Sequence, residues 1–317
     1  MAGLYIHIPF CKKACHYCNF HFSTSLKNRK KIISSMIKEI EIKSIGYEDL
    51  IETIYFGGGT PSLLSIIEID SLIKAVIDNF KISKKPEITL EANPDDLNTS
   101  KLKELSNSLI NRLSIGIQSF NDQDLKLMNR SHNSFDSINC IDNSLKYFDN
   151  ISIDLIYGMP NSNLISWEKN LNLALNWDLN HISAYALTVE PKTALEKYIQ
   201  KEIILPLDEE FVYDQFNLMY DKLLDLNYIN YELSSYDKKG YFSKNNSGYW
   251  LGKKYVGIGP SSHSFDGFSR SWNVSNNKLY VSDIQNNKMY HQKEKLTHVD
   301  QYNEYIMTGL RTMWGIS

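Results

Sequence analysis

Short apolar runs rich in β-branched residues alternate with stretches of helical periodicity over the first two-thirds of the chain. Strands that alternate with helices are typical of right-handed βα units on a parallel sheet. The pattern therefore predicts an α/β fold, with a partial (β/α)6 barrel over residues 1–205. The six predicted strands are 4–8, 51–56, 87–91, 112–117, 151–157 and 181–187, and the predicted helices are 26–45, 63–80, 100–108, 135–148 and 167–177.

The alternation ends at about residue 205. The pattern of the later residues predicts a helix at 208–226, strands at 228–233 and 254–258, an Asn/Ser/Gly-rich loop at 243–248 and a polar stretch through Asn287. We interpret residues 206–317 as a C-terminal α+β cap over the mouth of the barrel.

Composition narrows the class of protein. A chain of 317 residues with 42% hydrophobic content can bury one large core. A net charge of −3 without a basic cluster argues against nucleic acid as the main partner. No apolar run approaches the roughly 20 residues that span a bilayer, so any membrane contact should be peripheral. Because Met1 leads directly into a predicted strand, we expect no targeting segment and a cytoplasmic location.

Three cysteines follow the first predicted strand. Cys11, Cys15 and Cys18 have the spacing CxxxCxxC. Three thiolates from one short loop can each ligate a different iron of a [4Fe–4S] cluster, which leaves the fourth iron open to a small molecule. The spacing therefore favours a cluster that takes part in chemistry.

Other uses of these cysteines are less well supported by the sequence. A structural zinc site needs a fourth ligand at usable spacing, and no second knuckle follows, although His16 and His21 lie nearby. Only Cys140 remains as a disulfide partner, and it lies in a predicted helix, where we expect a buried thiol. Zinc and incidental thiols remain alternatives at this point.

Polar residues gather where the predicted strands end, which is the face on which βα barrels place their sites. Gly57, Gly58 and Gly59 follow the second strand and allow a ligand close to the backbone. Glu91, Gln118 and Asp154 lie at or near the ends of the next three strands and can serve an ammonium group and ribose hydroxyls. Arg130 is a candidate for a carboxylate. Each of these residues could also be an ordinary solvated polar group.

The ordered motifs resemble the radical S-adenosylmethionine (SAM) enzymes of the anaerobic coproporphyrinogen III oxidase group, and most closely the HemW haem chaperones. The resemblance extends from residue 2 to the end of the chain. The motifs are CxxxCxYC after Tyr5-Ile6-His7-Ile8-Pro9-Phe10, GGGTPS at 57–62, Glu91-Ala92-Asn93-Pro94, Gly116-Ile117-Gln118-Ser119-Phe120, Asn129-Arg130 with His132, and Asp154-Leu155-Ile156-Tyr157-Gly158-Met159-Pro160.

The resemblance implies a radical SAM barrel that binds a [4Fe–4S] cluster and SAM. Cys11, Cys15 and Cys18 would hold the cluster, and an electron from a reducing donor would generate a 5′-deoxyadenosyl radical. Matching positions for SAM contacts are Tyr5, Tyr17, Gly58, Gly59, Thr60, Glu91, Gln118, Arg130, Asp154 and Ala186.

Two departures from the oxidases favour the chaperones. The oxidases have a fourth cysteine two residues after the third, where this chain has Phe20, and they carry an N-terminal extension, whereas four residues precede Tyr5 here. The resemblance therefore implies a protein that binds haem and delivers it to an acceptor protein. An oxidase-like enzyme acting on a porphyrinogen or another tetrapyrrole is the alternative, and a relative whose cluster is merely structural is a third.

The haem-linked motif HNxxYW of the chaperones is altered. The chain has Asn245 at the histidine position, and an amide is a poor ligand for haem iron. His263 is the candidate ligand in its place, while Tyr249 and Trp250 could stack on a porphyrin or simply pack in the cap. Residues 302–311 resemble the entry to a small C-terminal helical domain, and we expect that domain to be missing or reduced.

Overall fold

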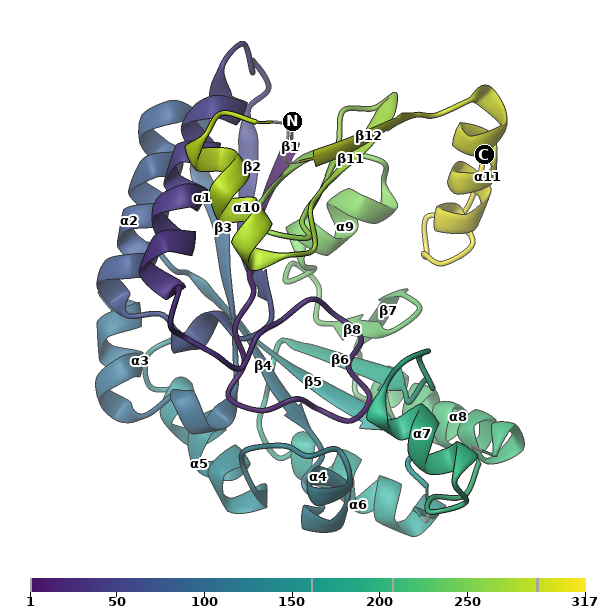
Figure 1. The fold of residues 1–317 in the computed structure, drawn as a ribbon. Helices are drawn as coiled ribbons and strands as arrows, with labels where there is room; N and C mark the ends of the chain where they lie inside the picture. Colours follow the sequence, from purple (N-terminus) through teal and green to yellow (C-terminus); the bar gives the residue numbers. More distant parts are fainter. Residues whose placement is uncertain (1, 161, 207, 289–290) are drawn as a thin grey trace.

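The computed structural model describes residues 2–160, 162–206, 208–288 and 291–317, and its fold is built on one sheet (Figure 1). Within these residues the sheet has 12 strands in the order β12-β11-β10-β9-β1-β2-β3-β4-β5-β6-β8-β7. The first six strands of the chain are parallel neighbours, and all six predicted strands are confirmed. They are β1 Ala2–Ile8, β2 Ile51–Gly58, β3 Ile82–Ala92, β4 Arg112–Gln118, β5 Ile151–Tyr157 and β6 His181–Ala186.

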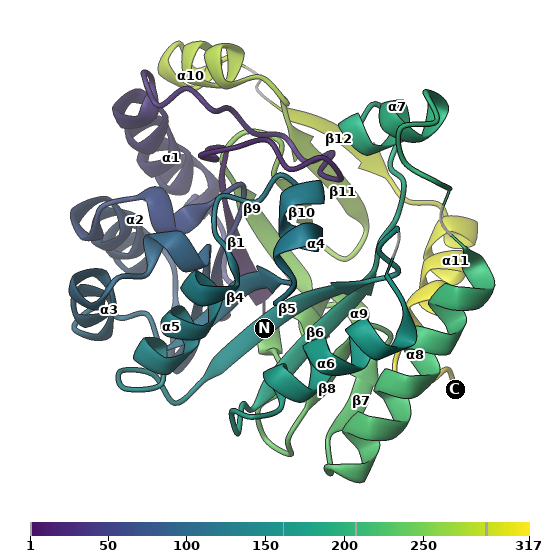
Figure 2. The same cartoon turned by 90° about the horizontal axis from the view of Figure 1, so that it is seen from below.

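Helices cover the outer face of these strands (Figure 2). Ile32, Met36 and Ile40 of α1, four residues apart, are fully buried and belong to the same hydrophobic core as the strands. This spacing places one helix face against the sheet. The helices of this part are α1 Arg29–Ser44, α2 Ile66–Asn79, α3 Thr99–Ser106, α4 Asp122–Leu127, α5 Ser134–Ser144, α6 Leu164–Ala174 and α7 Ala194–Gln200, with 3-10 turns η1 Pro61–Leu63 and η2 Pro94–Asp96.

The C-terminal part of the chain extends the sheet at both edges. On one side β9 pairs with β1 in parallel, and β10, β11 and β12 continue antiparallel. On the other side β8 pairs with β6, and β7 pairs with β8. The sheet therefore stays open, as the prediction of a partial barrel requires. The strands are β7 Ile229–Glu232, β8 Ser235–Asp237, β9 Lys254–Ile258, β10 His263–Phe265, β11 Ser269–Asn273 and β12 His291–Lys295.

The predicted loop at 243–248 is wrong, because α9 (Lys244–Trp250) occupies it. Two local contacts explain the helix. The Ser243 side chain accepts a hydrogen bond from the Asn246 N–H, and the Glu87 carboxylate accepts hydrogen bonds from the Lys244 and Asn245 N–H groups. These bonds satisfy N–H groups that have no partner within the first turn of a helix.

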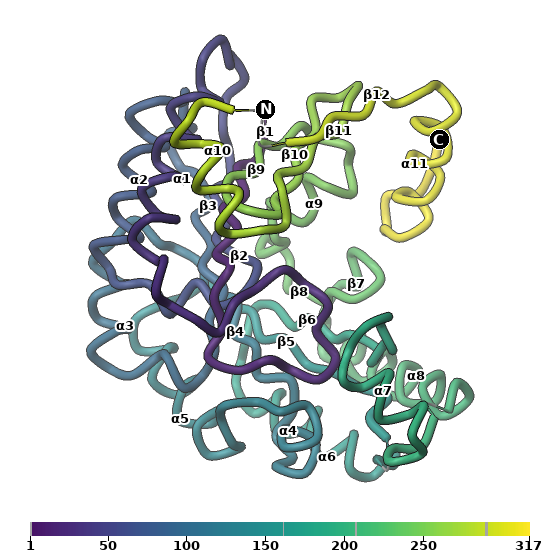
Figure 3. Tube along the Cα trace, viewed as in Figure 1, coloured from purple at the N-terminus to yellow at the C-terminus, as the bar shows by residue number. Residues whose placement is uncertain are grey.

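The other C-terminal helices complete the fold. The predicted helix at 208–226 is confirmed as α8 (Glu209–Asp225). The sequence did not predict α10 (Asn277–Gln285), and α11 (His298–Gly309) lies beside the C-terminus, away from the helices that cover β1 to β6 (Figure 3). No helix in the described ranges is both long and apolar enough to cross a membrane.

Candidate functional site

The three predicted cluster cysteines lie in the long loop between β1 and α1 (Figure 3). Cys11, Cys15 and Cys18 are all partly exposed and free of disulfides. Backbone hydrogen bonds fix the loop at both ends of the motif: the Cys11 N–H donates to the Ser23 carbonyl at 3.1 Å, and the His16 N–H donates to the Met128 carbonyl at 3.1 Å. The loop is therefore tied to the segment that follows β4.

The three thiols lie close enough to influence one another electrostatically. Burial raises the pKa of Cys11 to about 11 and raises that of Cys18, and the neighbouring cysteines contribute to both shifts. Among the described residues, no three His, Cys, Asp or Glu side chains converge on a point that could hold a single metal ion.

The glycine loop, which we define as residues 57–59 at the end of β2, lies directly against the cysteine loop. Gly58 has φ +105°, and a Cβ there would come within 2.6 Å of the His7 ring, so this position requires glycine. The Gly59 N–H donates to the Ile8 carbonyl at 2.8 Å. Thr60 is buried, and it acts to lower the pKa of the nearby Cys11 thiol. β1 and β2 thus bring the two predicted motifs together.

Glu91 is held at the end of β3 by two donors. The Tyr55 hydroxyl donates to one carboxylate oxygen at 2.8 Å, and the Gly58 N–H donates to the other at 3.2 Å. Desolvation within the barrel raises the pKa of Glu91 to about 7, and the charge of Asp154 adds to the shift. The carboxyl group can therefore change its charge near neutral pH.

Arg130 joins the cysteine loop to the strand ends. Its Nη2 donates to Asn93 Oδ1 at 2.7 Å and to the Gly116 carbonyl at 2.8 Å. Its Nη1 lies 3.5 Å from the Cys15 Sγ and 3.5 Å from the Tyr17 hydroxyl. The Nε is buried and has no hydrogen-bond partner. A guanidinium that lies beside a cysteine thiol and keeps one N–H without a partner is suited to an anionic ligand.

Gln118 ends β4 in a strained backbone conformation. Its φ of +67° lies in the left-handed region, which is uncommon outside glycine and is frequent at ligand sites. A Cβ at Gly116 would come within 2.8 Å of the Gln118 amide and 3.2 Å of Arg130. Gly116 therefore makes room for both predicted SAM contacts.

The remaining predicted SAM contacts surround the same strand ends. Asp154 accepts a hydrogen bond from Ser114 at 3.4 Å, and burial raises its pKa to about 6. Tyr5 stacks on Tyr55 with ring centroids 6.1 Å apart. Ala186 is the last residue of β6 and is exposed. The topology thus gathers the SAM positions expected from the resemblance, which come from the six neighbouring strands β1 to β6 and the loops that follow them.

The candidate haem residues pack against different neighbours. His263 is exposed on β10 and stacks against Trp272, with ring centroids 6.1 Å apart. Tyr249 packs edge-on against Tyr255, and Trp250 lies under the Arg311 guanidinium at 4.8 Å.

Asn245, at the histidine position of the haem-linked motif, points into the protein. It is 4% exposed, and its Oδ1 accepts a hydrogen bond from the Thr53 hydroxyl at 3.0 Å. The same side-chain oxygen also lies next to Gly3, near the beginning of β1. The side chain therefore joins α9 to the strands beneath it.

Sequence reasoning missed two residues that hold the site together. Tyr55 lies inside β2 and binds Glu91, while Asn93 follows β3 and binds Arg130. For Tyr55 the signal is the alternation of side chains along a strand, which places Tyr55 on the same face of β2 as Gly57. For Asn93 the signal is its place in the Glu91-Ala92-Asn93-Pro94 motif, two residues after Glu91.

The fold and the site are those of a radical SAM domain. The sequence profile of the radical SAM superfamily matches residues 5–174, more than half of the chain. The chain is 35% identical over 324 residues to the heme chaperone HemW of Bacillus subtilis, covering 100% of this chain and 85% of that protein. The chain belongs to the radical SAM superfamily and, within it, to the HemW family.

Two further comparisons agree with this assignment. The heme chaperone HemW of Buchnera aphidicola subsp. Acyrthosiphon pisum is 40% identical over 267 residues, covering 82% of this chain and 69% of that protein. The solved structure of the coproporphyrinogen III oxidase HemN from Escherichia coli superposes with a TM-score of 0.85, covering 98% of this chain and 75% of that one. At 22% sequence identity, this second likeness shows a shared fold.

Membership of the superfamily implies a [4Fe–4S] cluster and SAM. The residues present fit both groups. Three free thiols share one loop, the Arg130 Nη1 lies 3.5 Å from the Cys15 Sγ, and the Nε of the same guanidinium has no hydrogen-bond partner, so Arg130 can still donate to an anionic ligand.

Proposed function

We propose that the protein is a haem chaperone that binds a [4Fe–4S] cluster and SAM and delivers haem to an acceptor protein. The observation that carries this proposal is the 35% identity to the heme chaperone HemW of Bacillus subtilis over the whole chain. A reducing cytoplasm suits the cluster thiolates, and a reducing protein partner would supply electrons to the cluster.

The cluster ligands in this proposal are Cys11, Cys15 and Cys18. Arg130 would bind the SAM carboxylate, because its guanidinium already faces Cys15 and has a free donor. Glu91 would accept hydrogen bonds from the amino group. Gln118 and Asp154 would contact the ribose hydroxyls, the remaining SAM positions would line the same pocket, and the reduced cluster would supply one-electron chemistry to SAM.

His263 is the proposed haem ligand. Its exposure on β10 leaves the imidazole open to a ligand, and the stacked Trp272 ring offers an aromatic surface beside it. Asn245 is unsuited because an amide is a weak ligand and this one is already bonded to Thr53. Tyr249 and Trp250, on α9, would add contacts to the porphyrin edge.

The test is a haem titration of the anaerobically reconstituted protein, followed by transfer to an apo-haemoprotein. We expect saturable binding at micromolar haem and transfer to the acceptor. His263→Ala should alter the Soret and visible bands, whereas Asn245→Ala should leave the band positions unchanged.

Two results would contradict the proposal. A protein that shows no saturable haem spectrum is not a chaperone of this kind. Reductant- and SAM-dependent decarboxylation of coproporphyrinogen III would instead support the oxidase-like alternative, and formation of 5′-deoxyadenosine alone would show only that the bound cluster can cleave SAM.

A further inference from the structure

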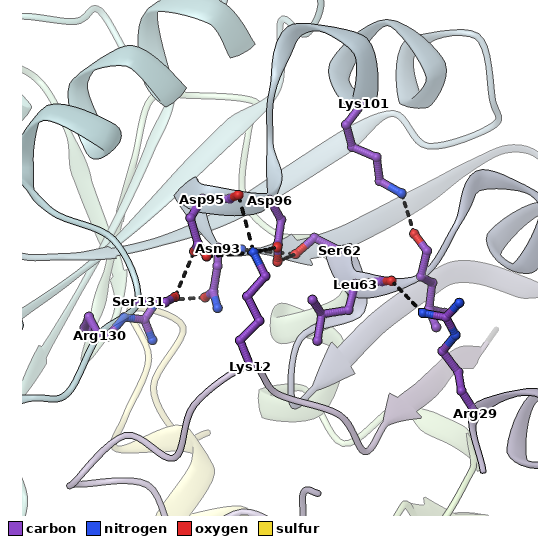
Figure 4. A network of polar contacts seen from close by, with 11 residues as sticks. Lys12, Arg29, Ser62, Leu63, Asn93, Asp95, Asp96, Lys101, Arg130 and Ser131 are labelled. Atoms are coloured by element: carbon purple, nitrogen blue, oxygen red, sulfur yellow. Dashed lines mark hydrogen bonds and ion pairs between the residues drawn. The ribbon is translucent and has the colours of Figure 1, made fainter. Parts of the chain in front are cut away.

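We infer that the turn at residues 93–96, directly after β3, positions the loops that hold the cluster and SAM; we name these residues the hub turn. The turn reaches three segments that are far apart in the sequence (Figure 4). They are the cysteine loop, the segment after the glycine loop and the segment that carries Arg130. The inference rests on the proposed cluster and SAM sites and is independent of haem delivery.

The link to the cysteine loop is Lys12, which lies between Cys11 and Cys15. The Lys12 ammonium contacts the Asp95 carboxylate at 2.7 Å and also forms an ion pair with Asp96. The Asp96 side chain is only 5% exposed. An ion pair with a buried partner keeps more of its strength than one in open solvent, because water screens it less.

The link to the glycine loop is Ser62, one residue beyond Pro61. Its hydroxyl donates to Asp96 at 2.7 Å, and the same oxygen accepts a hydrogen bond from the Asn93 N–H at 3.2 Å. Ser62 is buried. Asp96 therefore binds the cysteine loop and the glycine loop with one carboxylate.

The link to the third segment has two parts. Asn93 Oδ1 accepts a hydrogen bond from Arg130 at 2.7 Å, and Asp95 accepts one from the Ser131 hydroxyl at 2.9 Å. Arg130 in turn reaches Cys15. The hub turn thus fixes Lys12, which follows Cys11, and Arg130, which contacts Cys15.

These contacts can hold the three cysteines in register, although none of the four hub residues is a proposed ligand. Loops that must all face one ligand lose conformational freedom when the site forms. Bonds from one turn to each loop already restrict the loops before the ligands bind, so less conformational freedom is lost on binding. We therefore assign Asp96 and Asp95 as positioning residues that act on the cluster through Lys12.

The experiment uses the reconstituted holoprotein with Lys12→Met, Asp96→Asn and the double variant. Methionine keeps an unbranched apolar side chain nearly as long as that of lysine and removes the charge, and asparagine can still accept the bond from Ser62. The measurements are the rate of iron release to a chelator, the SAM dissociation constant by calorimetry, and the change that SAM causes in the electron paramagnetic resonance spectrum of the reduced cluster. Lys74→Met is the matched control, because Lys74 pairs with Asp78 on the exposed face of α2.

We expect iron release about fivefold to tenfold faster and SAM binding weaker in Lys12→Met, with a smaller or delayed spectral response to SAM. The double variant should be no worse than Lys12→Met, because Asp96 acts through the lysine. Lys12→Arg should restore most of the wild-type behaviour, and Lys74→Met should match wild type.

Unchanged iron release and SAM affinity in both single variants would overturn the inference. Faster release that merely follows a lower melting temperature of the apoprotein would also overturn it, since that result indicates general destabilisation. If alanine variants of Cys11, Cys15 and Cys18 retained their iron, the cluster site itself would be wrong, a failure that is separate from this one.

Discussion

At the residue scale, Glu91 combines a structural and a binding role. Tyr55 and the Gly58 N–H hold its carboxylate, while burial and the charge of Asp154 raise its pKa to about 7. SAM offers amino N–H donors, which an ionised carboxylate accepts better than a protonated one. Binding of SAM should therefore favour loss of the Glu91 proton.

The first prediction is that SAM affinity rises as the pH increases from about 6 to 8, because Glu91 ionises in this range. Glu91→Gln should bind SAM more weakly and should flatten that part of the profile. Calorimetry across this pH range is the measurement. An equally steep profile in Glu91→Gln would show that another group controls the binding.

Glu91 should also affect the pH dependence of stability. The pKa of Glu91 is higher in the folded protein than the ordinary value of 4.5, so the folded state keeps a proton that the unfolded chain releases. Its contribution to the free energy of unfolding should therefore fall as the pH rises from 4.5 to about 7, and should level off above that range. Denaturant titrations of the apoprotein at several pH values should show that the free energy of unfolding changes less with pH in Glu91→Gln than in wild type.

The cysteines provide a second prediction. Cys15→Ala should lose the brown chromophore and most of its iron, because an alanine leaves a second iron of the cluster without a protein ligand. Cys140→Ala is the control, since Cys140 is buried in α5 beside Ser144. Iron analysis after anaerobic reconstitution separates the two. Full iron content in Cys15→Ala would exclude the assigned ligand set.

At the element scale, α9 shows how tertiary contacts can produce a short helix from residues of low helix propensity. The helix begins where Glu87 accepts two backbone N–H groups, and Asn245 joins it to Thr53. Neither contact can be read from the local sequence, because β3 and β2 supply the partners. This is the physical reason why 243–248 reads as a loop.

The third prediction concerns that contact. Asn245→Ala should lower the free energy of unfolding by about 1–3 kcal/mol, because it leaves the buried Thr53 hydroxyl without its acceptor. Lys244→Ala, on the exposed side of the same helix, should change it by no more than about 0.5 kcal/mol. Denaturant unfolding of the two variants is the measurement. Equal small effects would show that the Thr53 contact adds nothing to stability.

Many residues of the candidate site could be predicted because they lie at the carboxyl ends of strands. Apolar runs locate the strands, and in a parallel sheet their carboxyl ends meet, so Gly58, Glu91 and Gln118 follow from the pattern. The contacts of Lys12 with Asp95 and Asp96 could not be predicted, since they join loops that the sequence separates widely. The left-handed backbone of Gln118 has no local sequence signal either, because glutamine does not favour it.

At the scale of the whole molecule, the proposed division into residues 1–205 and 206–317 does not separate two sheets. β9 pairs with β1, and β8 pairs with β6, so the later residues complete both edges of the first six strands. A strand edge left without a partner exposes N–H and C=O groups and promotes aggregation. The two parts should therefore depend on each other for stability.

The fourth prediction follows from this shared sheet. The full chain should unfold in one cooperative transition, and a fragment of residues 2–205 should aggregate or lack a cooperative transition. Circular dichroism during denaturant titration tests the full chain, and size-exclusion chromatography tests the fragment. Two separated transitions, with the fragment monomeric and stable, would contradict this prediction.

The two parallel neighbours of β1 also have a consequence for biosynthesis. Ala2 pairs with Ile51 on one side and with Lys254 on the other. A ribosome makes the first neighbour early and the second only after most of the chain has emerged, and such distant pairings form slowly. The strand that leads into the cysteine loop therefore stays half-paired through most of translation. We expect iron–sulfur loading to follow the synthesis of β9, which closes that edge.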